Sequence, residues 1–306
     1  MSDMLGSNIL GFDIGGTYIK YGVVDGQGEM SFEDKMQTPK PDDQQGEKIL
    51  ALLLSKADEL IQLHDVVAIG ISSHGVVDNE KGIVTCSSYH LPGLKDLPIV
   101  EKLTEKFSLP VIIDNDAKAA AIGEYWHGSA QKFKSFVFLA LGTSIGGAIV
   151  IDGKLLRGLD NCAGEVGYLI TNERDLDKPF IPGAWEAYGS ASSLIKRYKV
   201  VKGAELTSDD FNRDLAAKDS DTLRVLEDYV YSLTSGLISL AHTLAPEAFI
   251  LGGGITKMGQ ALLDPVKKKY QERALDPVKN IKISMATLGN HAGMVGAAYL
   301  AKQKIS

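Results

Sequence analysis

Two segments that lie far apart in this chain have the same order of structural signals. Residues 11–29, GFDIGGTYIKYGVVDGQGE, and residues 139–155, LALGTSIGGAIVIDGKL, each predict a strand, a glycine-containing turn, a second strand and a turn at Asp-Gly. The two segments share this layout more than they share identical residues. Because a layout repeated in two halves is typical of a duplicated fold, we expect two related lobes that face each other.

The rest of the chain predicts helices and buried strands in alternation. Apolar residues recur at helical spacing from about residue 44 to 63, and the run VVAIGIS at 66–72 predicts a buried strand. The run VIID at 111–114 leads directly into an alanine-rich helix, and a strand EAFIL leads into the glycine loop ILGGGIT at 250–256. Strands that alternate with helices in this way indicate an α/β fold with parallel strands.

Composition agrees with a globular protein of more than one compact unit. The 306 residues exceed one ordinary domain, so two domains or two lobes are expected. With 44% hydrophobic and 23% charged residues, a large core is available and disorder is not expected. The net charge of −7 argues against a nucleic-acid partner, because such proteins present a basic face.

Two further observations concern the redox compartment and the membrane. Cys86 and Cys162 are the only cysteines, too few for a disulfide framework or a cysteine-based zinc site. No segment has the pattern of a secretory signal, and no apolar run approaches the ~20 residues of a membrane span. We therefore expect a cytoplasmic protein that does not enter the membrane.

Three glycine-rich turns each follow an apolar strand. Such a turn exposes backbone N–H groups that bind an anion, although each turn taken alone can also be a tight hairpin. Two of the turns carry a threonine hydroxyl beside the glycines, Thr17 and Thr143. Neither GxxxxGK[ST] nor GxGxxG occurs in the chain, which excludes a P-loop enzyme and a dinucleotide-binding Rossmann domain.

The stretch LPVIIDNDAKAAAIGE, residues 109–124, places two carboxylates and an amide where a buried strand meets a helix. Asp114, Asn115 and Asp116 can cap the helix, because Asp and Asn at a helix start accept hydrogen bonds from its first N–H groups. The carboxyl end of a parallel strand is also where α/β proteins bind ligands. The residues alone leave both interpretations open.

Five motifs follow one another in an order typical of a single family: FDIGGTYIKYGVV, IDNDAKAAAIGE, LALGTSIGGAIV, AGEVGY and LGGGI. In this combination the chain resembles the ROK family of sugar kinases and related repressors over nearly its whole length. The resemblance implies the actin-like ATPase fold with a ribonuclease H-like core, in which ATP and a sugar meet in a cleft between two lobes. Repressors of the family carry an N-terminal helix-turn-helix, and the eight residues before the first predicted strand disfavour that branch. We expect residues 1–115 and 293–306 to form the small lobe and residues 116–292 the large one.

The resemblance also implies which residues bind ATP and Mg²⁺. The segment DIGGT would face the ATP phosphates and the magnesium ion, and a nearby lysine would add positive charge. The second glycine turn would form another phosphate loop, and the third would lie near the adenosine. The residues implied in this way are Asp13, Gly15, Gly16, Thr17, Lys20, Gly142, Thr143, Gly253 and Gly254.

The sugar-binding residues are implied by the same resemblance. Asn115 matches the sugar-binding asparagine of the family, and Asp116 matches its catalytic base. Glu165 in AGEVGY and Glu186 in AWEAY match two further sugar-binding glutamates, and Gly75 matches a glycine in a substrate loop. Each glutamate also has a plainer interpretation, since Glu165 can be a surface residue and Glu186 can stabilise a helix N-terminus.

This chain departs from the family at two places near the sugar. His74 and Val76 flank Gly75 in a loop that usually contains prolines. Tyr168 stands where most members have a histidine, and the stretch LITNERDLDKPFIPGAW that follows it contains no cysteine, so no structural zinc is expected. The pattern resembles the β-glucoside kinases. We expect the pocket to accept a substituent at C1 of the sugar, with Tyr168 stacked on it, although Tyr168 can equally be a core residue.

The resulting prediction is an ATP-dependent sugar kinase. Asp116 would accept the proton of the attacking hydroxyl, expected to be O6 of a hexose or β-glucoside. Specificity for glucose, a β-glucoside, fructose or N-acetylmannosamine is left open by the sequence. Two other classes also remain: a sugar-sensing member that does not catalyse, and an actin-like ATPase that does not act on sugars. A homodimer is expected from the resemblance alone.

Overall fold

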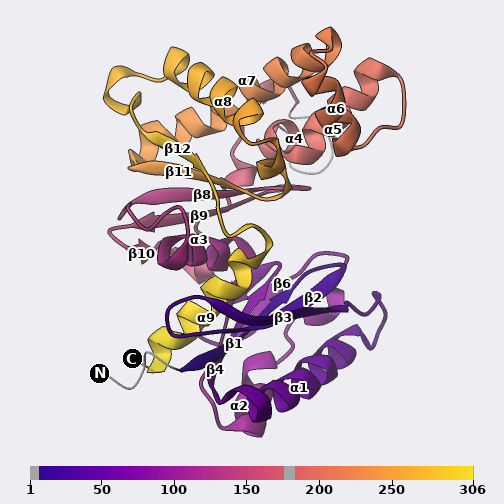
Figure 1. Cartoon of the computed structure of the whole chain (residues 1–306), viewed down its shortest axis with the longest axis vertical. Helices are drawn as coiled ribbons and strands as arrows, with labels where there is room; N and C mark the ends of the chain where they lie inside the picture. Colours follow the sequence, from indigo (N-terminus) through magenta and orange to yellow (C-terminus); the bar gives the residue numbers. More distant parts are fainter. Residues whose placement is uncertain (1–6, 176–182, 306) are drawn as a thin grey trace. The chain divides into compact units, whose positions relative to one another are not determined.

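The computed structural model describes residues 7–175 and 183–305, which form two compact units (Figure 1). The first unit takes in the described residues up to Lys132, residues 155–163 and the residues from Asn290 onward. The second unit takes in residues 133–154 and the described part of residues 164–289. Each unit is described below by itself. Among the described helices, none is both long and apolar enough to cross a membrane.

The first unit contains a five-stranded sheet with the order β3-β2-β1-β4-β7. The first three strands form antiparallel hairpins; β4 pairs in parallel with β1, and β7 pairs in parallel with β4. The strands are β1 (Asn8–Ile14), β2 (Tyr18–Val24), β3 (Met30–Gln37), β4 (Val66–Ser73) and β7 (Val111–Asn115). A separate antiparallel hairpin is formed by β5 (Val76–Asp78) and β6 (Ile83–Cys86).

Two pairs of helices complete the first unit. The pairs are α1 (Gln45–His64) with α2 (Ile99–Phe107), and α3 (Asp116–His127) with α9 (Ala292–Ile305). Because side chains alternate along a strand, Leu10 and Phe12 of β1 point into the apolar core shared with α1 and α2, while Gly11 points to the opposite face. On that face α9 lies very close to the sheet: a Cβ atom on Gly70 would be 2.0 Å from the carbonyl oxygen of Ala297. Glycine in β4 is therefore required for this packing.

The second unit repeats the same sheet with the order β10-β9-β8-β11-β12. Its strands β8 and β9 form an antiparallel hairpin; β11 pairs in parallel with β8, and β12 pairs in parallel with β11. The strands are β8 (Phe136–Leu141), β9 (Ile145–Ile151), β10 (Lys154–Leu155), β11 (Ala248–Gly252) and β12 (Lys282–Met285). The helices are α4 (Glu186–Gly189), α5 (Ala191–Lys202), α6 (Ser208–Ala216), α7 (Ser220–Leu244) and α8 (Gln260–Arg273). Apolar residues of the sheet and of α5 to α8 form one core.

The repeated layout predicted from the sequence is confirmed, because the two sheets have corresponding strand orders. The strands predicted at VVAIGIS, VIID and EAFIL are present as β4, β7 and β11, and the predicted helix is α1. The helix α3 belongs to the same compact unit as the first sheet, whereas the lobe boundary expected from the sequence lies before this helix, after residue 115. That lobe boundary stays a prediction.

Candidate functional site

The carboxyl ends of β1, β4 and β7 meet at one edge of the first sheet. The strand register places Asp13 beside Ser72, and Ser72 beside Asp114. The Ser72 hydroxyl donates a 2.8 Å hydrogen bond to Oδ1 of Asp13, and Lys20 Nζ lies 3.3 Å from Oδ2. Burial raises the pKa of Asp13 above its ordinary value; the charge of Lys20 opposes this shift, and the negative charge of Asp116 adds to it.

The turn between β1 and β2 has its tip exposed and its base fixed. The Gly15 N–H donates to the carbonyl of Tyr18 over 3.1 Å. Thr38, just after β3, donates from its N–H to the carbonyl of Thr17 (3.1 Å) and from its hydroxyl to the carbonyl of Gly15 (2.7 Å). Gly16 and Thr17 are exposed. The turn is thus held at the sheet edge with its tip accessible to a ligand.

Asp114, the first carboxylate of the strand–helix junction, points into the first unit. Asp114 is only 1% exposed. Arg157 Nη1 lies 2.7 Å from its Oδ2, and Asn161 Nδ2 donates a 3.0 Å hydrogen bond to its Oδ1. These contacts neutralise the carboxylate inside the protein, so Asp114 has a structural role.

Asn115 is the N-cap of α3. Its Oδ1 accepts hydrogen bonds from the N–H groups of Ala117 (3.0 Å) and Lys118 (3.2 Å). Its Nδ2 donates to the carbonyl of Gly75 over 2.9 Å. The capping interpretation is therefore correct for Asn115. A role in sugar binding remains compatible with it, because the hydrogen bonds described here use only one of the two Nδ2 hydrogens.

Asp116 faces outward from the first turn of α3. Its side chain is 44% exposed, and its Oδ1 accepts a 2.7 Å hydrogen bond from the Ala117 N–H. His74 Nδ1 lies 3.4 Å from its Oδ2. The adjacent Gly75 has φ +103°, and a Cβ atom there would lie 2.3 Å from the carbonyl oxygen of Cys86. This position therefore requires glycine, which keeps the loop tight beside the carboxylate.

In the second unit, Glu186 lies against the turn between β8 and β9. Its carboxylate accepts hydrogen bonds from the Ile145 N–H and the Ser144 hydroxyl. Burial raises the pKa of Glu186 above its ordinary value, and these two hydrogen bonds partly oppose the shift. The same turn carries Gly142 and Thr143, and the carbonyl of Gly142 accepts a 3.2 Å hydrogen bond from the Ser192 N–H. This turn therefore joins a half-buried carboxylate to the start of α5.

Glu165 and Tyr168 lie on a short turn that packs against β9. The Val166 N–H donates to the carbonyl of Gly164 over 2.7 Å, and the Tyr168 N–H donates to the carbonyl of Glu165 over 3.3 Å. Val166 is buried, whereas Glu165 is exposed and Tyr168 is 47% exposed. The structure thus favours an accessible Tyr168 over a core residue.

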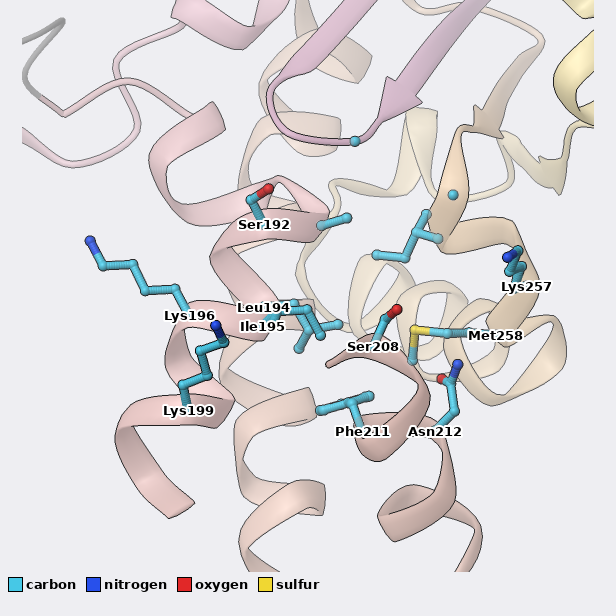
Figure 2. Close-up of a pocket in the computed structure, with 14 residues that line it drawn as sticks. Ser192, Leu194, Ile195, Lys196, Lys199, Ser208, Phe211, Asn212, Lys257 and Met258 are labelled. Atoms are coloured by element: carbon cyan, nitrogen blue, oxygen red, sulfur yellow. The ribbon is translucent and has the colours of Figure 1, made fainter. Parts of the chain in front are cut away.

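Gly254 lines a pocket of about 600 Å³ within the second unit, together with Gly142 of the β8–β9 turn. The pocket is floored by apolar side chains and rimmed by polar ones. Figure 2 shows Ser208 and Asn212 of α6 pointing into it, with Lys196 and Lys199 on one side and Lys257 on the opposite side. The lining residues are Gly142, Ala191, Ser192, Leu194, Ile195, Lys196, Lys199, Ser208, Phe211, Asn212, Gly254, Ile255, Lys257 and Met258.

Most of this pocket could not be predicted from the sequence. Of its lining residues, only Gly142 and Gly254 were predicted, from their glycine-rich turns, and none of those contributed by α5 and α6 was. The i, i+4 spacing of Ser208 and Asn212 places these two polar side chains on one face of α6, but nothing in the spacing distinguishes a pocket wall from a solvated helix surface.

Among the described residues, no group of three or more His, Cys, Asp or Glu side chains is arranged to hold a metal ion. The expected absence of a zinc motif concerns residues 169–185, of which residues 176–182 lie outside the described residues. That expectation stays a prediction.

Known proteins resemble this chain along almost its full length. The sequence model of the ROK family matches residues 9–304. A glucokinase of Halalkalibacterium halodurans is 32% identical over 96% of this chain and 95% of its own length. A beta-glucoside kinase of Listeria monocytogenes is 30% identical over 95% of this chain and 96% of its own length.

Solved structures give the same result for the fold. A ROK family glucokinase from Streptomyces griseus, solved with glucose and AMPPNP, has a TM-score of 0.81 and 30% identity, covering 97% of this chain and 100% of its own. The predicted actin-like ATPase fold is thereby confirmed, and so is the class of ATP-dependent carbohydrate kinase.

Proposed function

The chain belongs to the ROK family, and from this premise we propose that it transfers the γ-phosphoryl group of ATP to the O6 hydroxyl of a hexose or a β-glucoside. The observation that carries the proposal is the position of Asp116. An exposed carboxylate stands at the start of α3, at the carboxyl end of a parallel strand, on the sheet edge that also carries Asp13. Ligands bind at such edges in α/β proteins.

Asp116 is proposed as the general base. Its Oδ1 accepts the Ala117 N–H, which orients the carboxylate, and its Oδ2 lies 3.4 Å from His74 Nδ1. It accepts the proton of the attacking hydroxyl as the phosphoryl group is transferred. Asn115 and Glu186, with Glu165 and the loop at Gly75, are proposed to hold the other sugar hydroxyls.

The nucleotide is proposed to bind with its adenosine in the pocket beside α5 and α6, whose apolar floor and polar rim suit a base and a ribose. Gly253 and Gly254 adjoin that end, and the turn at Gly142 and Thr143 offers N–H groups to the phosphates. The turn of Gly15, Gly16 and Thr17, with Lys20, is proposed to bind phosphate as well.

Mg²⁺ is proposed to bind near Asp13. Burial and the charge of Asp116 raise the pKa of this carboxyl, while Lys20 and Ser72 oppose the shift, and an added cation beside Oδ1 and Oδ2 would stabilise the negative charge further. Carboxylate oxygens suit Mg²⁺, which is commonly bound by one or two carboxylates together with substrate phosphates. When bound, Mg²⁺ would neutralise part of the negative charge of the phosphates.

The proposal is tested by coupling ADP release to NADH oxidation with Mg-ATP and a panel of free hexoses, N-acetylated hexosamines and β-glucosides. Sugar-dependent ADP release is expected, and the best substrate names the specificity. The phosphorylated product is then identified by NMR to establish O6. Sugar binding without ADP release would favour a sugar-sensing protein, and ATP hydrolysis that no sugar changes would favour a different ATPase.

The exposed Tyr168 supports tolerance of a substituent at C1 of the sugar. A tyrosine with 47% of its surface accessible is able to stack on an aglycone. The substitution Tyr168→His should therefore lower turnover of a β-glucoside relative to free glucose. An unchanged ratio of the two rates would remove Tyr168 from this role.

A further inference from the structure

Asn161 lies at the centre of a buried hydrogen-bond network in the first unit. The residue is 6% exposed. Its Nδ2 donates to the carbonyl of Val77 (2.9 Å) and to Oδ1 of Asp114 (3.0 Å), and its Oδ1 accepts from Arg157 Nη1 (3.1 Å). A carbonyl and a carboxylate only accept hydrogen bonds, and a guanidinium only donates. The orientation of the Asn161 amide is therefore fixed by its partners.

The main chain of Asn161 is held as firmly as its side chain. The Asn161 carbonyl accepts a hydrogen bond from the buried Lys118 Nζ, on the first turn of α3. Asn161 adopts φ +60°, a left-handed conformation that asparagine tolerates better than most residues. Arg157 contacts both Asp114 and Asn161. The segment 155–163 is therefore linked to β7 through Asp114 and to α3 through Lys118.

The network joins the two segments that carry the proposed sugar-side residues of the first unit. One Nδ2 hydrogen of Asn161 goes to Val77, two residues after Gly75, and the other goes to Asp114, which precedes Asn115. A second link between the same segments is the hydrogen bond from Asn115 to the carbonyl of Gly75. The two links together set the distance between the Gly75 loop and the start of α3.

We propose that Asn161 and Arg157 are positioning residues for phosphoryl transfer. They act through Asp114 and the Gly75–Val77 segment to fix where Asn115 and Asp116 lie, and the inference rests on the proposed role of Asp116. Reactions of this class depend mainly on positioning, and a misplacement of about 1 Å lowers the rate on the order of 10²-fold.

The test compares variants of Asn161 that keep its size. Asn161→Asp replaces the Nδ2 donor by an oxygen, which then faces the Asp114 carboxylate and the Val77 carbonyl. We expect kcat/KM for the sugar to fall about 10²-fold. KM for ATP should be unchanged, because the pocket proposed for the adenosine is lined by residues of the second unit, and the hydrogen bonds of Asn161 do not involve the turn at Gly15. A kcat/KM within twofold of the original protein would overturn the proposal.

Arg157 provides a conservative pair of variants. Arg157→Lys keeps the positive charge beside Asp114 and should retain most of the activity, whereas Arg157→Met should lose as much as Asn161→Asp. A matched control is Lys202→Met, which breaks the 2.7 Å ion pair with Asp219 in the second unit. It should lower the melting temperature and leave kcat/KM for the sugar unchanged. Equal losses of activity in Lys202→Met and Arg157→Met would show a general stability effect and would overturn the proposal.

Amide hydrogen exchange separates this inference from the proposed function, because it needs no turnover. In the folded Asn161→Asp protein, the amides of Ala117 and Lys118, which Asn115 caps, should exchange faster together with those of residues 75–77. Unchanged exchange at both segments would overturn the positioning role. If the original protein phosphorylates no sugar, but exchange is faster in Asn161→Asp, the kinase proposal is refuted and the structural link between the two segments is still established.

Discussion

At the scale of single residues, Asp116 combines a hydrogen bond that holds the start of α3 with a proposed role as the general base. Its Oδ1 accepts the Ala117 N–H, a bond that an asparagine oxygen also accepts. Asp116→Asn should therefore fold normally while losing about 10²–10⁴-fold in kcat, the usual contribution of a general base. Asp43→Asn, an exposed change before α1, is the control. Retention of a tenth or more of kcat in Asp116→Asn would exclude Asp116 as the base.

Glu186 gives a prediction about pH. Because its pKa is raised in the folded protein, the folded state binds this proton more tightly than the unfolded state does. The free energy of unfolding should consequently fall as the pH rises from about 4.5 through the raised pKa. Glu186→Gln removes this dependence, so its stability relative to the original protein should increase between pH 4.5 and pH 7. Urea unfolding of both proteins at several pH values measures the difference between their free energies of unfolding. A difference that stays constant with pH would contradict the prediction.

At the scale of elements, the start of α3 combines a helix cap with a proposed sugar contact, and one substitution separates them. Serine caps a helix about as well as asparagine, whereas alanine at this position costs about 1 kcal/mol. Both variants lose the hydrogen bond from Nδ2 to the Gly75 carbonyl, so Asn115→Ser should unfold at a slightly lower urea concentration than the original protein, and Asn115→Ala at a lower one still. Both remove Nδ2, so both should raise KM for the sugar. An unaltered KM in Asn115→Ser would limit Asn115 to capping.

The elements also show what the sequence could predict. The strand–turn–strand repeat and the helix after VIID depend on neighbouring residues, and both are found in the structure. The network at Asn161 was not predictable in this way, because Arg157 and Asp114 are 43 positions apart and meet only through the fold. The polar face of α6 became recognisable as a pocket wall only once its packing beside α5 and the segment at Gly254 was known.

At the scale of the whole molecule, the proposed nucleotide pocket is lined entirely by residues of the second unit. A Cβ atom at Gly254 would have no neighbour within 4 Å, so a large side chain fits there without disturbing the backbone. Gly254→Trp should raise KM for ATP at least tenfold and leave the melting temperature nearly unchanged. The control is Val200→Trp, at an exposed position of α5 outside the pocket. Equal KM values for ATP in the two variants would place the nucleotide elsewhere.

The oligomeric state is a separate prediction at this scale. The homodimer expected from the family resemblance is measured by light scattering of the purified protein over a range of concentrations. A mass near 33 kDa at all concentrations would correspond to the single chain of 32.9 kDa and would contradict the dimer.

The helix α9 has a consequence for how the protein is made. The first strand of the chain packs against this last helix, and Gly11 of β1 would clash with the carbonyl of Met294 if it carried a side chain. During synthesis on a ribosome, β1 emerges about 280 residues before the start of α9. The sheet of the first unit therefore lacks α9 until residues 292–305 have been made, and in the interval the glycines of β1 and β4 that α9 covers are open to chaperones. The second unit is contained within residues 133–289 and has no such delay.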